Sequence, residues 1–150
     1  MSSLSAASAL VKAGVNARLS RILTTGRERA ADLGDAGDEL FDAAAALLAG
    51  GKRTRALLAG LGAALALEGP ERDEMLDSAL VAGTGAALEL YQASALMHDD
   101  VIDDASLRRG QPAAHRRLQV LHRDRAWLGD ARAFGASAAI LLGDLLLSAA

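Results

Sequence analysis

The stretch that decides the fold is Glu89-Leu-Tyr-Gln-Ala-Ser-Ala-Leu-Met-His-Asp-Asp-Val-Ile-Asp103. Positions three or four residues apart share one face of a helix. With Asp100 at its edge, that face carries Glu89, Gln92, Leu96, Asp99 and Asp103. Such a polar stripe, on a helix otherwise rich in Ala and Leu, suits a wet cavity inside a helical bundle, although a solvated acidic helix end is the alternative. We expect an all-α bundle around a central cavity.

The carboxylates at the end of this stretch predict a metal site. Four acidic residues fall within residues 99–104. Acids at the C-terminal end of a helix repel the helix dipole and one another, so the cluster needs a compensating cation. Oxygen ligands suit Mg²⁺, which shares its coordination between one or two carboxylates, water and substrate phosphate. The candidate ligands are Asp99, Asp100 and Asp103.

Bulk composition limits the classes of function. The chain has 150 residues, a net charge of −3 and 3% aromatic residues, which gives nucleic-acid binding little support. Cysteine is absent from the sequence, so disulfides are excluded. The first residues lack the pattern of a secretory signal. Residues 136–150 are apolar but include Asp144, and they are too few to span a bilayer. We expect a cytoplasmic protein without stable membrane insertion.

The apolar spacing predicts one all-α domain over residues 1–150, without strands. The expected helices cover residues 4–33, 38–49, 54–67, 73–104 and 131–150, with a polar, poorly patterned segment at 115–130 and a loop at 108–112. Glu68-Gly-Pro70 should stop the third helix. Gly83 and Gly85 should let neighbouring helices approach the fourth. The last helix is apolar nearly all round and should be buried on most sides, so we expect the bundle to be incomplete in this chain.

Two basic motifs accompany the acids. Gly50-Gly-Lys-Arg-Thr-Arg55 places three cations after two glycines at the start of a helix, which suits a bound phosphate. A solvated basic turn is the alternative. Arg108-Arg109-Gly110 either clamps phosphate groups or neutralises the neighbouring aspartates. Taken together, the acids and both basic motifs indicate a site for two polyphosphate groups.

These motifs, in this order, resemble the N-terminal half of the head-to-tail trans-prenyl diphosphate synthases. The resemblance covers about residues 38–150, and its further quoted stretches are Arg108-Arg-Gly-Gln-Pro-Ala-Ala-His115 and Gly143-Asp144. It implies an isoprenoid-synthase-type helical bundle and a homodimer. The implied activity is Mg²⁺-dependent condensation of isopentenyl diphosphate with an allylic prenyl diphosphate.

The resemblance also implies residue roles. Asp99 and Asp103, supported by Asp100, would hold Mg²⁺ on the allylic diphosphate, which Arg108 would also contact. The residues that would bind isopentenyl diphosphate are Lys52, Arg55, Arg109 and Gln92, the last at a position where the family often has His. Arg53 matches the basic run of the motif and is counted with the substrate-binding residues.

Residues one and two turns before Asp99 are candidates for setting product length. In the family, bulky residues four and five positions before the first Asp close the tunnel early. Ala95 and Ser94 occupy these positions here, and both are small. Tyr91, one turn deeper, is either the tunnel floor or an ordinary core aromatic. We expect a product of about C20 or longer.

One family feature is missing after Asp104, namely the second Asp-rich motif. Two interpretations remain open. In the first, the chain is the N-terminal portion of an enzyme. In the second, it is a half-length, non-catalytic relative that binds diphosphate or modulates a full synthase. A terpene cyclase is disfavoured because it has no second diphosphate for the 50–55 motif to hold. We expect no robust turnover by the 150 residues alone.

Overall fold

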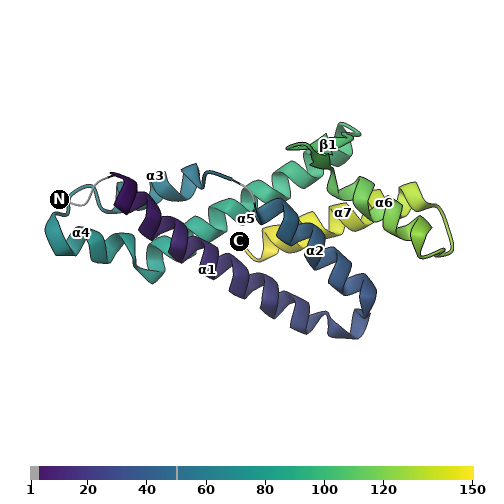
Figure 1. Ribbon diagram of the computed structural model, residues 1–150, viewed down its shortest axis with the longest axis horizontal. Helices are drawn as coiled ribbons and strands as arrows, with labels where there is room; N and C mark the ends of the chain where they lie inside the picture. Colours follow the sequence, from purple (N-terminus) through teal and green to yellow (C-terminus); the bar gives the residue numbers. More distant parts are fainter. Residues whose placement is uncertain (1–3, 50) are drawn as a thin grey trace.

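The computed structural model describes residues 4–49 and 51–150, and it is built of helices with one short β-hairpin (Figure 1). In chain order the elements are α1 (Leu4–Arg29), the 3-10 helix η1 (Ala31–Leu33), α2 (Asp35–Ala49), α3 (Thr54–Ala63), α4 (Gly69–Leu76), α5 (Ala79–Ile102), β1 (Leu107–Arg108), β2 (Gln111–Pro112), α6 (Ala114–Asp124) and α7 (Ala131–Ser148). α5 runs through the middle of an elongated molecule, with α3 and α4 at one end and α6, α7 and the hairpin at the other (Figure 1). The predicted all-α class is confirmed.

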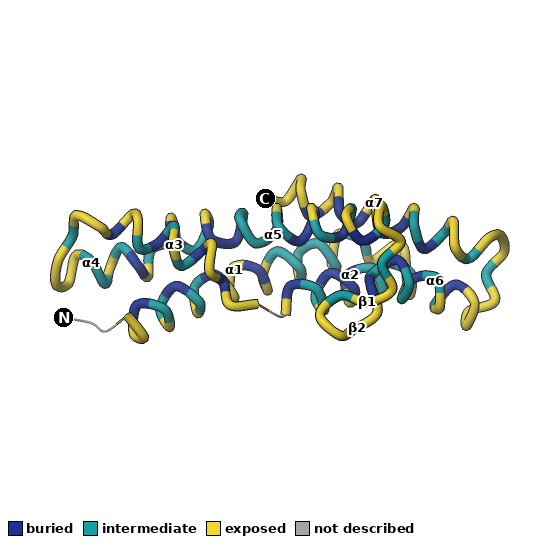
Figure 2. The backbone as a smooth tube through the Cα atoms, turned by 90° about the horizontal axis from the view of Figure 1, so that it is seen from above, coloured by how far each residue is buried: buried dark blue, intermediate teal, exposed yellow. Residues whose placement is uncertain are grey.

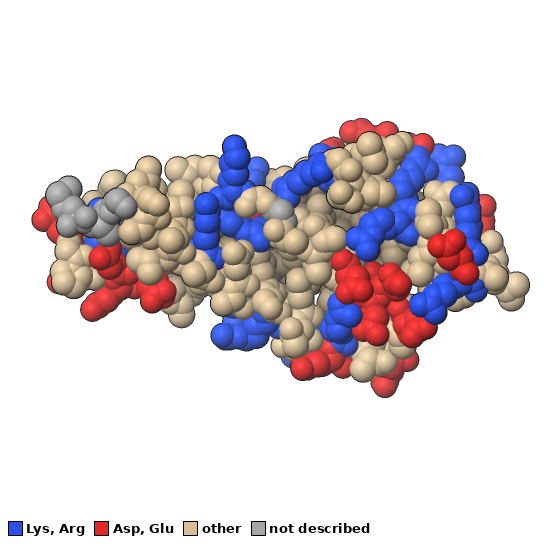
Figure 3. Space-filling model, in the orientation of Figure 1, with Lys and Arg blue, Asp and Glu red and all other residues tan. Residues whose placement is uncertain are grey.

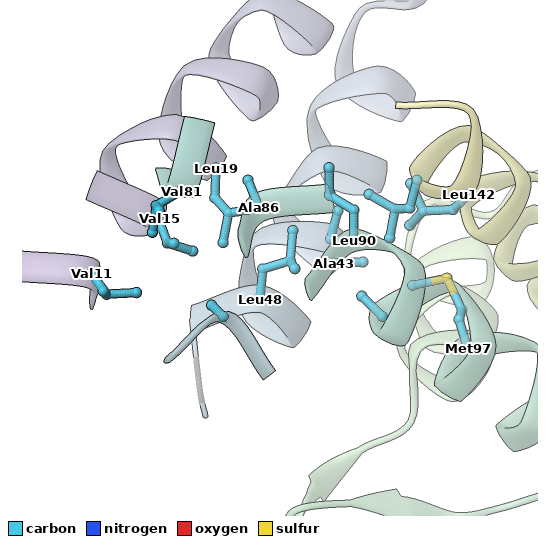
Figure 4. Close-up of a cluster of buried hydrophobic side chains, with 14 of the residues drawn as sticks. Val11, Val15, Leu19, Ala43, Leu48, Val81, Ala86, Leu90, Met97 and Leu142 are labelled. Carbon is cyan, nitrogen blue, oxygen red and sulfur yellow. The ribbon is translucent and has the colours of Figure 1, made fainter. Parts of the chain in front are cut away.

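The hydrophobic core follows α5, which contacts α1, α3 and α7 along its length. Figure 4 shows how side chains from α1, α2, α5 and α7 meet in one cluster. Leu90 and Met97 of α5 are 0% and 1% exposed. Burying each of these side chains contributes about 1.5–3 kcal/mol. The acidic end of α5 is therefore carried on a helix whose other face is buried in the core.

Gly85 lets two helices approach α5 closely. A Cβ atom at Gly85 would lie 2.5 Å from Cγ2 of Val15 on α1 and 2.9 Å from Cβ of Ala56 on α3. The sequence predicts the same role for Gly83, but no neighbouring atom lies within 4 Å of a Cβ placed there. The prediction is confirmed for Gly85 and wrong for Gly83.

The predicted helix over residues 73–104 is two helices, α4 and α5. The break falls at Ser78, whose Oγ accepts a hydrogen bond of 3.2 Å from the backbone N–H of Val81 and so caps α5. The predicted stop at Glu68-Gly-Pro70 is instead the start of α4. Pro70 lies in the first turn of α4, where its missing N–H costs no helical hydrogen bond.

The predicted loop at residues 108–112 belongs to a β-hairpin, so the expectation of no strands is wrong. The two strands pair antiparallel, and Arg109 and Gly110 form the turn with φ of 53° and 77°. Positive φ at both turn residues matches the twist of a tight hairpin. The polar segment that follows forms α6, whose buried residues are His115, Leu118 and His122. Because two of these three buried residues are histidines, the spacing of aliphatic residues in the sequence does not reveal this helix.

α7 has one buried and one exposed apolar face. Leu142 and Leu146 are buried, whereas Leu141 and Leu145 are 68% and 47% exposed. Figure 2 shows this exposed face along the outside of α7. The expected burial on most sides is therefore not met within the described residues. Among the helices in those ranges, α7 alone has the length and composition of a membrane span, with 33% of it buried.

Candidate functional site

The acidic end of α5 (residues 99–103) presents its carboxylates in two directions. The Asp99 side chain is 59% exposed, and Asp103, which ends the helix, is also exposed. Asp100 points the other way, and its side chain is 3% exposed. Asp99 and Asp103 are one helical turn apart and therefore share the solvent-facing side of the helix end.

Arg108 holds the buried carboxylate. Its Nε donates to both oxygens of Asp100 at 2.9 and 3.1 Å, and Nη2 also donates to Oδ1. Nη2 lies 3.6 Å from Oδ2 of Asp99. The hydrogen bond to Asp100 raises the pKa of Arg108 above its ordinary value, so the guanidinium stays charged. Of the two roles considered for this arginine, neutralising the neighbouring aspartates is the one seen here.

The acidic end fits Mg²⁺ through two of its three predicted ligands. Mg²⁺ requires only one or two protein carboxylates when a substrate phosphate completes its shell, and the exposed Asp99 and Asp103 supply that number. Asp100 differs, because its oxygens already accept hydrogen bonds from Arg108. Residues 4–49 and 51–150 contain no ready group of three or more acidic, His or Cys side chains that could hold a metal.

The basic turn (residues 51–55) places its cations on opposite sides. Lys52 and Arg55 are exposed, whereas Arg53 is 7% exposed and has φ of 54°. Gly50 of the motif lies outside the described residues. Arg53 therefore points into the protein. Its expected place among the substrate-binding residues is not supported by this geometry.

Arg53 ties three helices together. Its Nε donates to Oδ1 of Asn16 at 3.1 Å, Nη1 donates to Oε2 of Glu89 at 3.0 Å, and Nη2 donates to the carbonyl of Leu48. The side chains of Arg53 and Glu89 are only 8% and 12% exposed. Sequence reasoning missed the role of Asn16, which no local pattern marks. Glu89 was found on the polar stripe, but not as a partner of Arg53.

Arg109 brings the two basic motifs together. A Cβ atom at Gly51 would lie 3.7 Å from Nη1 and 3.9 Å from Nη2 of Arg109. The tip of the hairpin therefore lies beside the basic turn, although the two are far apart in the sequence. On the face drawn in Figure 3, Lys and Arg side chains gather around the hairpin and the neighbouring part of α6.

Of two pockets among the described residues, the smaller one borders this region. A pocket of about 370 Å³ lies between α2, α5, the hairpin and α6, and its charged lining residues are Asp100, Arg108, Arg109 and Arg117. A larger pocket of about 870 Å³ lies between α1, α2 and the end of α7. None of the predicted site residues lines the larger pocket. The expected central cavity, with the polar stripe of α5 as its wall, is not enclosed by the described residues.

The candidate chain-length residues face different ways. Tyr91 is 60% exposed and Ala95 is exposed, whereas Ser94 is 2% exposed. Gln92 is half-buried. Tyr91 and Ala95 share a face of α5 because they are four residues apart, and Ser94 belongs to the core-facing side. The described residues therefore do not bring Ser94 and Ala95 to one wall.

His98 links the acidic end of α5 to α7. Its Nε2 lies 3.3 Å from Oδ1 of Asp144 and 3.2 Å from the carbonyl of Ile140. The ring fits because position 143 is glycine, where a Cβ would lie 2.7 Å from Nε2. Sequence reasoning quoted Gly143 and Asp144 only as part of a resemblance. In the structure, Asp144 contacts the ring of His98, Gly143 leaves space for it, and His98 directly precedes Asp99.

Asp104 joins the end of α5 to α6 and α7. Its carboxylate lies 2.8 Å from Arg116, 3.3 Å from Arg132 and 4.0 Å from Nε2 of His115. Both ring nitrogens of His115 are buried without a hydrogen-bond partner among the described residues. Burial lowers the pKa of His115 below its ordinary value, and the charge of Arg116 lowers it further.

Comparison with known proteins identifies the family. Residues 38–150 match the polyprenyl synthetase family. The chain is 35% identical to nonaprenyl diphosphate synthase of Mycobacterium tuberculosis over 143 residues, which are 95% of this chain and 34% of that protein. It is 39% identical over 106 residues to the chloroplastic geranylgeranyl pyrophosphate synthase 11 of Arabidopsis thaliana, covering 69% of this chain and 23% of the relative.

A solved structure agrees with these relatives. The geranylgeranyl pyrophosphate synthase of Corynebacterium glutamicum, complexed with isoprenyl diphosphate and magnesium, superimposes with a TM-score of 0.75 at 34% identity. The match covers 93% of this chain and 38% of that one. The matches thus cover 23% to 38% of the length of these proteins. The family match extends over most of the chain, and the solved relative shares its fold, so this chain belongs to the polyprenyl synthetase family.

Proposed function

We propose that this chain carries the diphosphate-binding half of a Mg²⁺-dependent head-to-tail prenyltransferase. The observation that carries the proposal is the position of Arg109 beside Gly51. It brings the exposed cations of the basic turn close to the hairpin, whose other arginine, Arg108, is bound to the acidic end of α5. Acids and cations so arranged suit two diphosphate groups held side by side.

Each group has a proposed role in the condensation. Asp99 and Asp103 would hold Mg²⁺, which when bound neutralises charge on the allylic diphosphate. Arg108 stabilises the same negative charge, and Lys52, Arg55 and Arg109 bind isopentenyl diphosphate. The allylic C–O bond breaks as diphosphate leaves with the electron pair, and the isopentenyl double bond then forms the new C–C bond. The released diphosphate is the base that we propose for the proton lost in the last step.

A product of about C20 or longer remains our proposal, with Tyr91 as the tunnel floor. The similar proteins include nonaprenyl and geranylgeranyl synthases, so they do not select one length. Tyr91→Ala should improve binding of the longest prenyl diphosphates relative to geranyl diphosphate. An unchanged ranking of affinities would remove Tyr91 from this role.

The alternative is a non-catalytic relative that binds diphosphate or modulates a full synthase. The observation that supports it is that residues 4–49 and 51–150 contain no group of three or more His, Cys, Asp or Glu side chains that could hold a metal. Incubation with isopentenyl diphosphate, geranyl diphosphate and Mg²⁺ tests for turnover. We expect binding without robust turnover by the 150 residues, and efficient turnover would exclude the alternative and show that a second acidic motif is dispensable.

Binding itself tests the shared part of the proposal. Titration calorimetry with isopentenyl diphosphate should show binding that Lys52→Ala weakens at least tenfold, as expected for loss of a charged phosphate contact. Lys12→Ala on α1 is the matched control. Failure of the parent chain to bind would contradict the proposal.

We also propose a homodimer. Support comes from the exposed apolar side chains of α7, including Leu141 and Leu145. Light scattering during size-exclusion chromatography would test it, and a monomer at 100 µM (about a thousand times a 100 nM dissociation constant) would contradict it.

A further inference from the structure

The pocket between α2, α5, the hairpin and α6, here called the arginine pocket, carries an excess of positive charge. Its volume is about 370 Å³, and it is lined by Asp100, Arg108, Arg109 and Arg117 together with apolar side chains such as Met97. Asp100 and Arg108 neutralise each other through their hydrogen bonds. Arg109 and Arg117 also lie on the wall of this pocket, whose size suits a small ligand.

No hydrogen bond or ion pair among the described residues explains the position of Arg117. The neighbouring Arg116 bonds to Asp104 and to Gln119. For the side chain of Arg117, in contrast, residues 4–49 and 51–150 provide no ion pair or hydrogen bond. Arg117 also lies near the start of α6, and the first turn of that helix contains no acidic residue. A cation there is disfavoured by the helix dipole, so its presence is better explained by an anion than by the stability of the helix.

The arginine pocket adjoins the basic turn. Arg109 lines the pocket and its guanidinium also lies beside Gly51. Arg109 thus connects the basic turn, which contains Lys52, to the pocket that Arg117 lines. Arginine is suited to this place because its planar fork can bind two phosphate oxygens at once.

We propose that Arg117 is a further substrate-binding residue, which binds the diphosphate of isopentenyl diphosphate from the side opposite Lys52. The proposal rests on the proposed function, since it takes that diphosphate as the ligand. The apolar wall at Met97 and Leu47 lies beside the same charges and suits the short hydrocarbon part of this substrate. Neither the spacing of the basic motifs nor the family resemblance assigned a role to position 117.

Titration calorimetry of the whole chain with isopentenyl diphosphate, without Mg²⁺, tests the proposal. Arg117→Gln should weaken binding about tenfold or more, the loss expected for one charge-assisted phosphate contact. Arg123→Gln is the matched control, because Arg123 is an exposed arginine of the same helix outside the pocket. Its affinity should stay within about twofold of the parent.

A second variant, Arg117→Lys, keeps the proposal testable if Arg117→Gln does not fold. Arg117→Lys keeps the charge but removes the fork, so it should bind more weakly than the parent and more tightly than Arg117→Gln. Circular dichroism melting checks that each variant is folded. If Arg117→Gln does not fold, the affinity of Arg117→Lys decides, and an affinity equal to the parent overturns the proposal.

The outcomes separate this inference from the proposed function. If the parent binds isopentenyl diphosphate and Lys52→Ala weakens it, while Arg117→Gln binds as tightly as Arg123→Gln, only the role of Arg117 is overturned. If the parent does not bind at all, the proposed function fails and the role of Arg117 fails with it. Weaker binding by Arg117→Gln alone, with Arg123→Gln unchanged, supports the proposal.

Discussion

Breaking the buried Arg53–Glu89 ion pair should destabilise the chain strongly, and Glu89→Gln tests this. The two charged atoms are 3.0 Å apart, and their side chains are 8% and 12% exposed. Removing one partner of a buried pair typically costs about 3–5 kcal/mol, because the other charge is left buried and unpaired. Arg53 keeps its hydrogen bonds to Asn16 and Leu48, so we expect the lower end of that range, about 3 kcal/mol.

Urea unfolding followed by circular dichroism measures this loss. The matched control is Asp35→Asn, the same acid-to-amide change in the exposed pair of Asp35 and Arg125, whose side chains are 71% and 45% exposed. An exposed pair should contribute no more than about 1 kcal/mol. Because Arg53 orients the basic turn, Glu89→Gln should also weaken isopentenyl diphosphate binding. Equal free energies of unfolding for the two variants would refute the structural role assigned to Arg53.

Three further predictions concern the acids, the glycines and the buried histidine. Asp100→Asn should lower the free energy of unfolding by about 2–3 kcal/mol in urea titrations, because it leaves Arg108 without its buried partner, whereas the exposed Asp99→Asn should change it by less than about 1 kcal/mol. An equal effect of both changes would contradict the assignment. Gly85→Ala should destabilise the chain by about 1–3 kcal/mol, since its Cβ would meet Val15 and Ala56, while Gly83→Ala on the same helix should be neutral or slightly stabilising. Finally, stability should fall as the pH drops below about 6.5, the ordinary pKa of His, because the lowered pKa of His115 means that the unfolded chain binds the proton first. The difference between the parent and His115→Gln, measured by urea unfolding from pH 8 to pH 5, isolates this contribution from that of the carboxylates, and a difference independent of pH would exclude it.

The helical class and the acidic end could be predicted because both depend on local patterns. The spacing of apolar residues reports which face of α5 is buried, and the acids at its end are adjacent in the sequence. The sequence predicts that Arg109 and the basic turn both bind phosphate, but it does not predict that they lie side by side. The contact itself depends on a hairpin turn at Arg109 and Gly110, and a two-residue turn of this kind has a weak signal when it lacks Asn or Asp.

Three features could not be read from the sequence, each for a physical reason. Arg53 and Arg55 are chemically identical, and only long-range bonds to Asn16 and Glu89 turn one of them inward. α6 buries His115 and His122, so its buried face looks polar. The break at Ser78 is capped by a local hydrogen bond from Val81, and a Ser inside a helical pattern is a weak signal for such a break.

The most direct test of the account is calorimetric titration of the chain with dimethylallyl diphosphate, an allylic diphosphate, with and without Mg²⁺. The account predicts binding that requires Mg²⁺ and that is lost when Asp99 and Asp103 are both changed to Asn, in a variant that remains folded. Binding that is unaffected by Mg²⁺ and by the double substitution, or no binding by the parent chain, would contradict the claim that the end of α5 is a metal-dependent diphosphate site.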